Sequence, residues 1–217
     1  MSEFDELDNY SEIIEPKEIF YKLLTSPRDA FKFITDYKYD KHVTLLLCLA
    51  GIVRAFDRAA SKNLGDSFSL LGLIAFCVII GGLFGWITYY IYASLISWTG
   101  KWLEGTANTQ SILRTLAYAM FPSVFILILL IPQIAIYEIG MFQSDYDISN
   151  SGLINNIVYY GLLLCSVALG IWSFVLSIIG ISEVQKFSIW KALLNLLLPA
   201  LFFVAIILVF ALLFWTF

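Results

Sequence analysis

Residues 68–98 read FSLLGLIAFCVIIGGLFGWITYYIYASLISW and contain no charged side chain. About 20 consecutive apolar residues are enough for a helix to cross the roughly 30 Å hydrocarbon core of a bilayer. This stretch is longer than that, so it predicts a membrane-spanning helix that tilts or extends beyond the lipid. It indicates that most of this chain folds in lipid.

Four further apolar runs predict that the chain crosses the membrane repeatedly. They cover about residues 43–56, 116–139, 153–181 and 190–217. Together with residues 68–98 they predict an all-α fold, a polytopic membrane bundle of about five transmembrane helices. The composition agrees: 60% of the residues are hydrophobic and 14% are charged. Soluble domains have roughly 45–50% apolar and 25% charged residues.

The first run is the shortest. One charged residue lies inside it near its end, and two more follow directly after it. Arg54, Asp57 and Arg58 have helical spacing, so they share one helix face. Ionisable side chains at membrane depth usually pair, line a cavity or reach the headgroups. We expect Arg54 to pair with Asp57 and Arg58 to reach lipid phosphates, which anchors this helix end at the outer interface. A substrate or ion path is the alternative interpretation of this charge cluster.

Small residues inside the runs predict close helix packing. Gly81 and Gly85 lie four residues apart in the second run, and this spacing lets two helices approach closely. Similar pairs recur in the fourth run, Ser166 with Gly170 and Ser173 with Ser177. A permeation path also uses glycine, so that alternative stays open.

Prolines inside the runs predict kinks. Pro122 and Pro132 lie in the third run, and Pro199 follows the polar amide of Asn195 in the fifth. Proline bends a membrane helix, and neighbouring groups satisfy the carbonyls that it frees. Broken helices that present backbone groups to a substrate are the alternative.

The region before the first run divides into two parts. Residues 1–15 are acidic and lack an apolar period, which predicts a disordered tail that repels nucleic acid; a docking segment for a basic partner is the alternative. Residues 16–41 predict an amphipathic helical segment, because Ser26 suits an N-cap and Pro27 the first helical position. We expect this segment at the membrane interface or packed under the bundle. Residues 42–217 form the predicted transmembrane domain.

The positions of lysine and arginine predict the orientation, since cytoplasmic loops are enriched in both. Ten of them lie before the first run or in the breaks after the second and fourth runs, against three around the end of the first run: Arg54, Arg58 and Lys62. This distribution predicts a cytoplasmic N-terminus and a C-terminus outside.

No motif points to catalysis or to a cofactor. The sequence lacks a Walker-type loop, a Gly-x-Ser-x-Gly elbow, a His-Glu-x-x-His pattern and a Cys-x-x-Cys pair. His42 is its one histidine, and its three cysteines lack metal-ligand spacing. We therefore predict a protein that is not an enzyme and has no catalytic, cofactor-binding or metal-binding residue.

Three short stretches resemble a known family. They are Thr25-Ser26-Pro27-Arg28-Asp29-Ala30-Phe31, the segment from Arg114 through Tyr118 to Pro122, and the break between Trp172 and Ala192. They are similar to stretches of the Yip family, membrane proteins named for interacting with Ypt/Rab GTPases, and of its bacterial branch in particular. The resemblance covers about residues 16–217 and implies five helices in one bundle. The Asp-Leu-Tyr-Gly-Pro segment typical of eukaryotic members is missing, so a Rab-binding or trafficking role is not carried over.

These observations lead to two hypotheses about function. The first is a membrane scaffold or adaptor for other membrane components, whose partners are lipids and either a membrane protein or a second copy of the chain. The second is a transporter, channel or lipid-handling protein. The resemblance to the bacterial branch implies that the protein resides in the cytoplasmic (inner) membrane.

Overall fold

The structure is a computed structural model that describes residues 18–146 and 152–215, without the side chains of residue 206 and of those beyond residue 208. The described residues form helices joined by short connections, with no strand among them. The predicted all-α helical bundle is confirmed. The acidic tail at 1–15 lies outside the described residues. The helices belong to two compact units.

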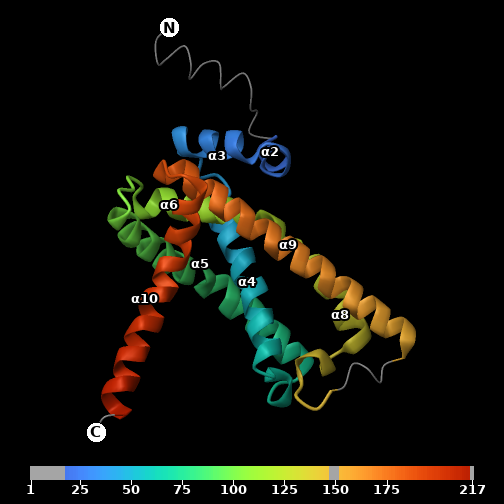
Figure 1. The fold of residues 1–217 in the computed structure, drawn as a ribbon. Coiled ribbons are helices and arrows are strands. Elements are labelled where there is room, and N and C mark those ends of the chain that lie inside the picture. Colours follow the sequence, from blue (N-terminus) through green and yellow to red (C-terminus); the bar gives the residue numbers. More distant parts are fainter. Residues whose placement is uncertain (1–17, 147–151, 216–217) are drawn as a thin grey trace. The chain divides into compact units, whose positions relative to one another are not determined.

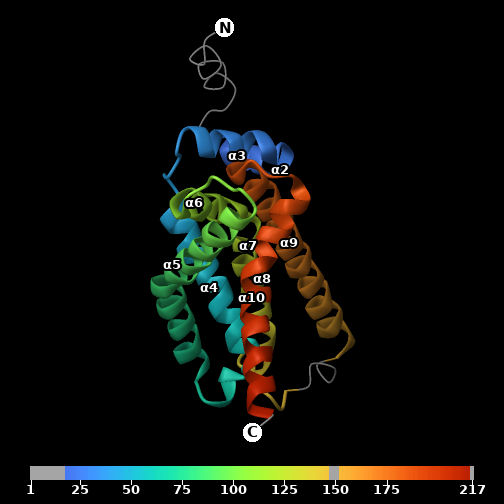
Figure 2. The same ribbon diagram turned by 60° about the vertical axis from the view of Figure 1, so that its left-hand side comes forward.

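The first unit combines the N-terminal helices with the ends of later ones (Figures 1 and 2). It holds α2 (Ile19–Thr25), α3 (Pro27–Asp36), α5 (Leu70–Trp102) from Tyr90 onward, α6 (Thr109–Ala119) up to Leu116, α9 (Leu153–Gln185) from Ser177 onward, and α10 (Ile189–Trp215). Its core is a cluster of buried apolar side chains: Ala93, Ile96, Ile112, Leu116, Ile181, Val184, Ala192 and Leu196.

The amphipathic segment packs its apolar face against this unit. Ile19, Leu23, Phe31 and Ile34 are fully buried. The ring of Phe31 lies so near α9 that a Cβ at Gly180 would approach it to 3.0 Å. In both views α2 and α3 lie across the ends of α9 and α10 (Figures 1 and 2). The apolar face of this segment thus packs on helices of the first unit, and its place relative to the membrane interface stays a prediction.

The chain after α3 is held by an ion pair. Ser26 precedes α3 and Pro27 occupies its first turn, but the Ser26 side chain makes no capping hydrogen bond. Instead, Nε of Arg114 donates to Oδ1 of Asp40 at 2.7 Å, and Nη2 donates to Oδ2 at 2.9 Å. Arg114 is 4% exposed, and a two-point contact of this kind fixes orientation as well as distance. The pair ties the residues after α3 to α6.

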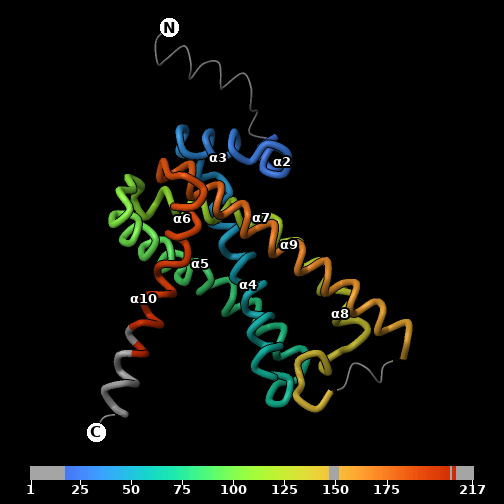
Figure 3. Tube along the Cα trace, viewed as in Figure 1, coloured from blue at the N-terminus to red at the C-terminus, as the bar shows by residue number. Residues whose placement is uncertain are grey.

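The second unit holds the remaining helices. These are α4 (Val43–Ser61), the 3₁₀ turn η1 (Leu64–Asp66), α5 up to Tyr89, α7 (Phe121–Val124), α8 (Ile126–Tyr137), the 3₁₀ turn η2 (Gly140–Phe142), and α9 up to Leu176. Phe56, Leu73 and Phe142 belong to its buried apolar cluster. The turns after α4 and α8 lie side by side (Figure 3), and the backbone N–H of Ser144 donates to Oδ1 of Asp66 at 3.1 Å.

Two helices are long and apolar enough to cross a membrane by themselves. Both α5 and α9 have 33 residues, and α6 with α7–α8 makes a third candidate that is broken between them. The break lies at Met120, two residues before Pro122, whereas Pro132 lies inside α8. The predicted kink of the third run is therefore a break at its first proline.

The other two predicted spans differ from this group. Helix α4 has 19 residues, which is about 28 Å, but its second half carries Arg54, Asp57 and Arg58. Within the described part of α10, Ile189–Ala205 forms an apolar helix that is shorter than α5 and α9. The count of five spans stays a prediction.

Candidate functional site

Helices α4 and α5 touch through three glycines in the second unit. A Cβ added to Gly51 would lie 2.3 Å from the carbonyl oxygen of Gly81 and 2.5 Å from Cα of Gly85. A Cβ on Gly81 would lie 2.8 Å from the Gly51 carbonyl oxygen, and one on Gly85 would lie 2.6 Å from Cα of Gly51. Side chains essentially never approach backbone atoms so closely, so this crossing requires glycine.

Gly81 and Gly85 were singled out in the sequence, but their partner Gly51 was not. A signal for it was available, because Gly51 and Ala55 repeat the same four-residue spacing of small residues. The structure places the small residues and the charged residues on the same part of α4.

A groove of about 500 Å³ lies beside the glycine contact. The three glycines belong to its lining, and α5 adds the apolar side chains of Phe76, Ile80 and Phe84. Each of these residues is four positions from the next, so all three lie along one side of α5. Near the other end of the lined stretch of α5, Tyr89 completes the groove.

Two cations of α4 and one that directly follows the helix line the same groove. Arg54, Arg58 and Lys62 follow one another at intervals of four residues, about 6 Å along the helix. Lysine and arginine do not commonly line an apolar cavity without a counter-ion. Yet no acidic side chain is among the residues that line this groove. The result is an electropositive strip facing an apolar wall.

Arg54 attracts the carboxylate of Asp57, but the two side chains do not close into the expected ion pair. The guanidinium carbon of Arg54 lies 5.5 Å from the centre of the Tyr89 ring, a distance typical of a cation–π contact. Among the ion pairs of the described chain, none joins Arg54 to Asp57. Asp57 is exposed and does not line the groove. Of the charge cluster, the structure thus brings Arg54 and Arg58 together in the groove and adds Lys62.

The break at Pro122 is satisfied by neighbouring groups. The backbone N–H of Ser123 donates to Oγ of Ser173 at 3.0 Å, and the Ser123 hydroxyl donates to the carbonyl of Met120 at 2.7 Å. Tyr118 is fully buried. The backbone amide of Ser123 is thus occupied by Ser173 and is not available to a substrate. This favours a structural role for the break.

Two other residues singled out in the spans, Gly170 and Pro199, lie within continuous helices. A Cβ at Gly170 would meet nothing within 4 Å, so the predicted seam with Ser166 has no neighbour at that glycine within the described chain. Pro199 lies inside α10, which continues past it.

A buried polar network in the first unit was largely missed from the sequence. Nδ2 of Asn195 donates to the Ile96 carbonyl at 3.1 Å and to Oγ1 of Thr99 at 2.9 Å. Its Oδ1 accepts from Nε2 of Gln185 at 3.3 Å, and Gln185 Oε1 accepts the N–H of Ala107 at 3.0 Å. Sequence reasoning noted the amide of Asn195 but could not identify partners from three other segments. The network joins α5, α9 and α10.

Comparison with known proteins gives the family. A family model described as the Yip1 domain matches residues 21–212. No significant match was found among curated proteins or among solved structures. The matched residues include Pro27, Tyr118 and Pro122, the positions on which the resemblance was based. The chain therefore belongs to the Yip family of membrane proteins, through a Yip1 domain that covers most of its length.

Proposed function

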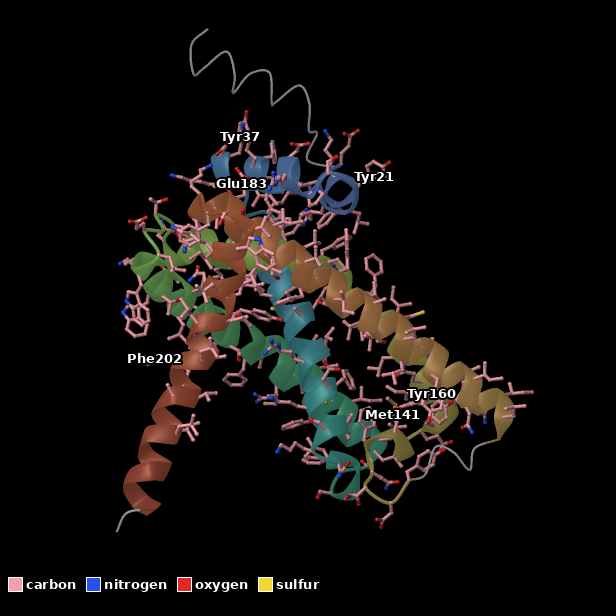
Figure 4. The ribbon with its side chains drawn as sticks, viewed as in Figure 1. Tyr21, Tyr37, Met141, Tyr160, Glu183 and Phe202 are labelled. Atoms are coloured by element: carbon pink, nitrogen blue, oxygen red, sulfur yellow. The ribbon has the colours of Figure 1, made fainter. Side chains whose placement is uncertain are left out.

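We propose that this protein is a non-enzymatic membrane adaptor or scaffold, which captures another membrane protein through α2 and α3. The observation that carries this proposal is that these helices are fixed by their buried face, while Tyr21 is 68% and Leu24 43% exposed on the other side. Figure 4 shows Tyr21 and Tyr37 on the outer side of the two helices. Yip proteins are membrane proteins that interact with other membrane proteins, which supports the same role.

A surface that is fixed before binding suits a docking role. Ordering a mobile segment on binding costs free energy that is lost from affinity. Here the buried face and the Asp40–Arg114 pair already order α2, α3 and the residues that follow. Exposed tyrosine is among the residue types that contribute most to protein interfaces. We call the exposed side of α2 around Tyr21 and Leu24 the docking face.

Replacing both Tyr21 and Leu24 by serine should reduce partner capture on the order of tenfold, since two anchors of an interface are lost. The measurement is crosslinking in cells, purification of the full chain in native lipid particles, and quantitative mass spectrometry of the proteins recovered with it. The matched control is Tyr160→Ser, because Tyr160 is 59% exposed and lies on α9 in the second unit. It should leave capture unchanged.

Deletion of residues 1–15 in the same experiment separates the tail from the docking face. Loss of capture in the deletion alone would move the docking element to the tail. Undiminished capture in both variants, or recovery of this protein without a stoichiometric partner, would contradict the adaptor role.

We also propose that the protein resides in the cytoplasmic membrane with its N-terminus in the cytoplasm and its C-terminus outside. Lys62 precedes α5 and Lys101 lies in its last turn, so a span formed by α5 places them on opposite sides. In a chain whose native cysteines are replaced, Lys62→Cys should react with an impermeant maleimide on intact cells. Lys101→Cys should react only after permeabilisation. The reverse pattern would invert the orientation.

The second candidate function is that of a transporter, channel or lipid-handling protein. The groove between α4 and α5 favours the lipid-handling form of this hypothesis, because cations and an apolar wall meet in it. Binding of a lipid there is the first requirement of that function.

A further inference from the structure

We propose that the groove between α4 and α5 binds one anionic phospholipid of the surrounding bilayer. Arg58 and Lys62 hold its phosphate, and one acyl chain lies along the apolar wall of α5. This site belongs to the second unit and is built from other chain segments than the docking face. It does not depend on the adaptor role.

The charges of the groove call for an anionic occupant. Arg58 and Lys62 have no ion-pair partner within residues 18–146 and 152–215. Of the acidic residues nearest in the chain, Asp57 is attracted to Arg54 and lies outside the lining, and the carboxylate of Asp66 accepts the N–H of Ser144. Arg58 and Lys62 therefore supply the positive charge that an occupant of the groove meets, while Arg54 lies over Tyr89. Cations held beside apolar surface are stabilised when a phosphate neutralises them, and the guanidinium fork suits phosphate in particular.

The shape of the groove suits a lipid better than a free anion. Its volume of about 500 Å³ lies within the range of roughly 300–1,000 Å³ that is usual for sites of small organic ligands. Phe76, Ile80 and Phe84 line it from α5, and they span about 12 Å of that helix. An inorganic phosphate would leave this wall uncovered, whereas an acyl chain covers it.

The direction of α4 and α5 determines at which end of the groove the lipid headgroup lies and along which side the acyl chain runs. Helix α4 ends at Ser61, and Lys62 lies in the turn that leads through η1 to α5. This turn is the polar end of the helix pair, so the phosphate belongs there, next to Lys62 and Arg58. The glycines at the crossing lie further from the turn and line the same groove. Their missing side chains leave room along the apolar wall, where the acyl chain is placed.

The test is a titration of the purified full chain in neutral detergent with pyrene-labelled phosphatidylglycerol and with phosphatidylcholine carrying the same chains. Energy transfer from tryptophan to pyrene reports binding. We expect phosphatidylglycerol to bind about tenfold more tightly or better. The preference should shrink as salt is raised, because part of it is electrostatic. Equal affinity for the two lipids at low salt would overturn the proposal.

Substitutions locate the site. The double variant Arg58→Gln with Lys62→Gln should bring phosphatidylglycerol binding down to the affinity of phosphatidylcholine. Lys101→Gln makes the same type of change at an exposed cation outside the groove, and it should leave the preference intact. An equal loss in both would show a general effect of net charge and would overturn the site. Arg58→Lys keeps the charge and should retain most of the preference.

Two further arms separate a lipid from a soluble anion. Ile80→Phe fills the groove beside the wall without adding a tryptophan donor and should weaken both lipids, with an unchanged melting temperature as evidence of folding. Inorganic phosphate at the concentration of the labelled lipid should not displace it. Full displacement by inorganic phosphate, or lipid binding that is unaffected by Ile80→Phe, would overturn the lipid as the occupant.

Discussion

Replacing Gly51 by leucine should prevent α4 and α5 from meeting and should leave the protein largely unfolded in mild detergent. A Cβ at this position already lies 2.3 Å from the carbonyl oxygen of Gly81 and 2.5 Å from Cα of Gly85. Both neighbours are backbone atoms, so no side chain can rotate away to make room. Overpacking of a close contact typically costs about 1–3 kcal/mol and sometimes more, and leucine adds a further branched group to this clash.

The measurement is the melting temperature of the purified full chain, together with the fraction that elutes as a single species in size exclusion. Gly51→Ala should lower the melting temperature clearly, and Gly51→Leu should abolish the folded species. Gly170→Ala is the matched control, because a Cβ there meets nothing within 4 Å. That variant should be neutral or slightly stabilising, since alanine favours a helix by up to about 1 kcal/mol over glycine.

Equal melting temperatures for Gly51→Ala and Gly170→Ala would contradict the close crossing of α4 and α5. Because the same glycines line the groove, the outcome also bears on the lipid site. A crossing that tolerates a side chain at Gly51 would leave the groove a different shape.

The sequence predicted the helices well because their signal is local. Residues 68–98 are apolar without interruption, and the helix observed there is α5 (Leu70–Trp102). The break of the third run at Pro122 was also local, since proline lacks the N–H of a helical turn. The backbone hydrogen bonds of a membrane helix close within the segment, so each run could be assigned without knowledge of its neighbours.

The contacts between helices were not predictable in the same way. Helical spacing suggested that Arg54 pairs with Asp57, yet the guanidinium lies over the ring of Tyr89. Tyr89 is 35 positions further along the sequence and comes near only because Gly51 meets Gly81 and Gly85. Spacing along one helix describes which residues share a face, but it does not describe what the neighbouring helix presents to that face.

The same limit explains the Asp40–Arg114 pair. These residues are 74 positions apart, and nothing in the sequence of either segment specifies the other. In the sequence, Arg114 is one of the cations that predict the orientation and is the first residue of a family-like stretch. Its near-complete burial follows from the packing of α6 in the first unit, which composition and periodicity do not define.

Replacing Asn195 by leucine should destabilise the protein by about 2–4 kcal/mol, because the buried groups around it lose their partners. Asn195 is fully buried, and its amide bonds the Ile96 carbonyl, the Thr99 hydroxyl and the Gln185 side chain. Leucine has a similar size but can make none of these bonds. The loss should appear as a lower free energy of unfolding in a reversible denaturant titration.

Gln185→Leu should have an effect of similar sign, since it removes the acceptor for the Ala107 N–H and the donor to Asn195. Gln110→Leu is the matched control, because Gln110 is exposed on α6 and should change the unfolding free energy by less than about 0.5 kcal/mol. The double variant of Gln185 and Asn195 decides whether the two amides act as a unit. Residues in one network show coupling of about 0.5–3 kcal/mol, so the double variant should lose less than the sum of the single losses.

Strictly additive losses would mean that Gln185 and Asn195 act independently, and an Asn195→Leu variant as stable as the native chain would contradict the network altogether. The distinction has a structural consequence for the first unit. Its polar residues at Thr99, Gln185 and Asn195 lie on three different helices, α5, α9 and α10. In an apolar surrounding, a hydrogen bond between side chains is directional, whereas apolar contacts are not. The network therefore fixes the register in which the ends of α5 and α9 meet α10, and its loss should leave helices that are still formed but no longer aligned.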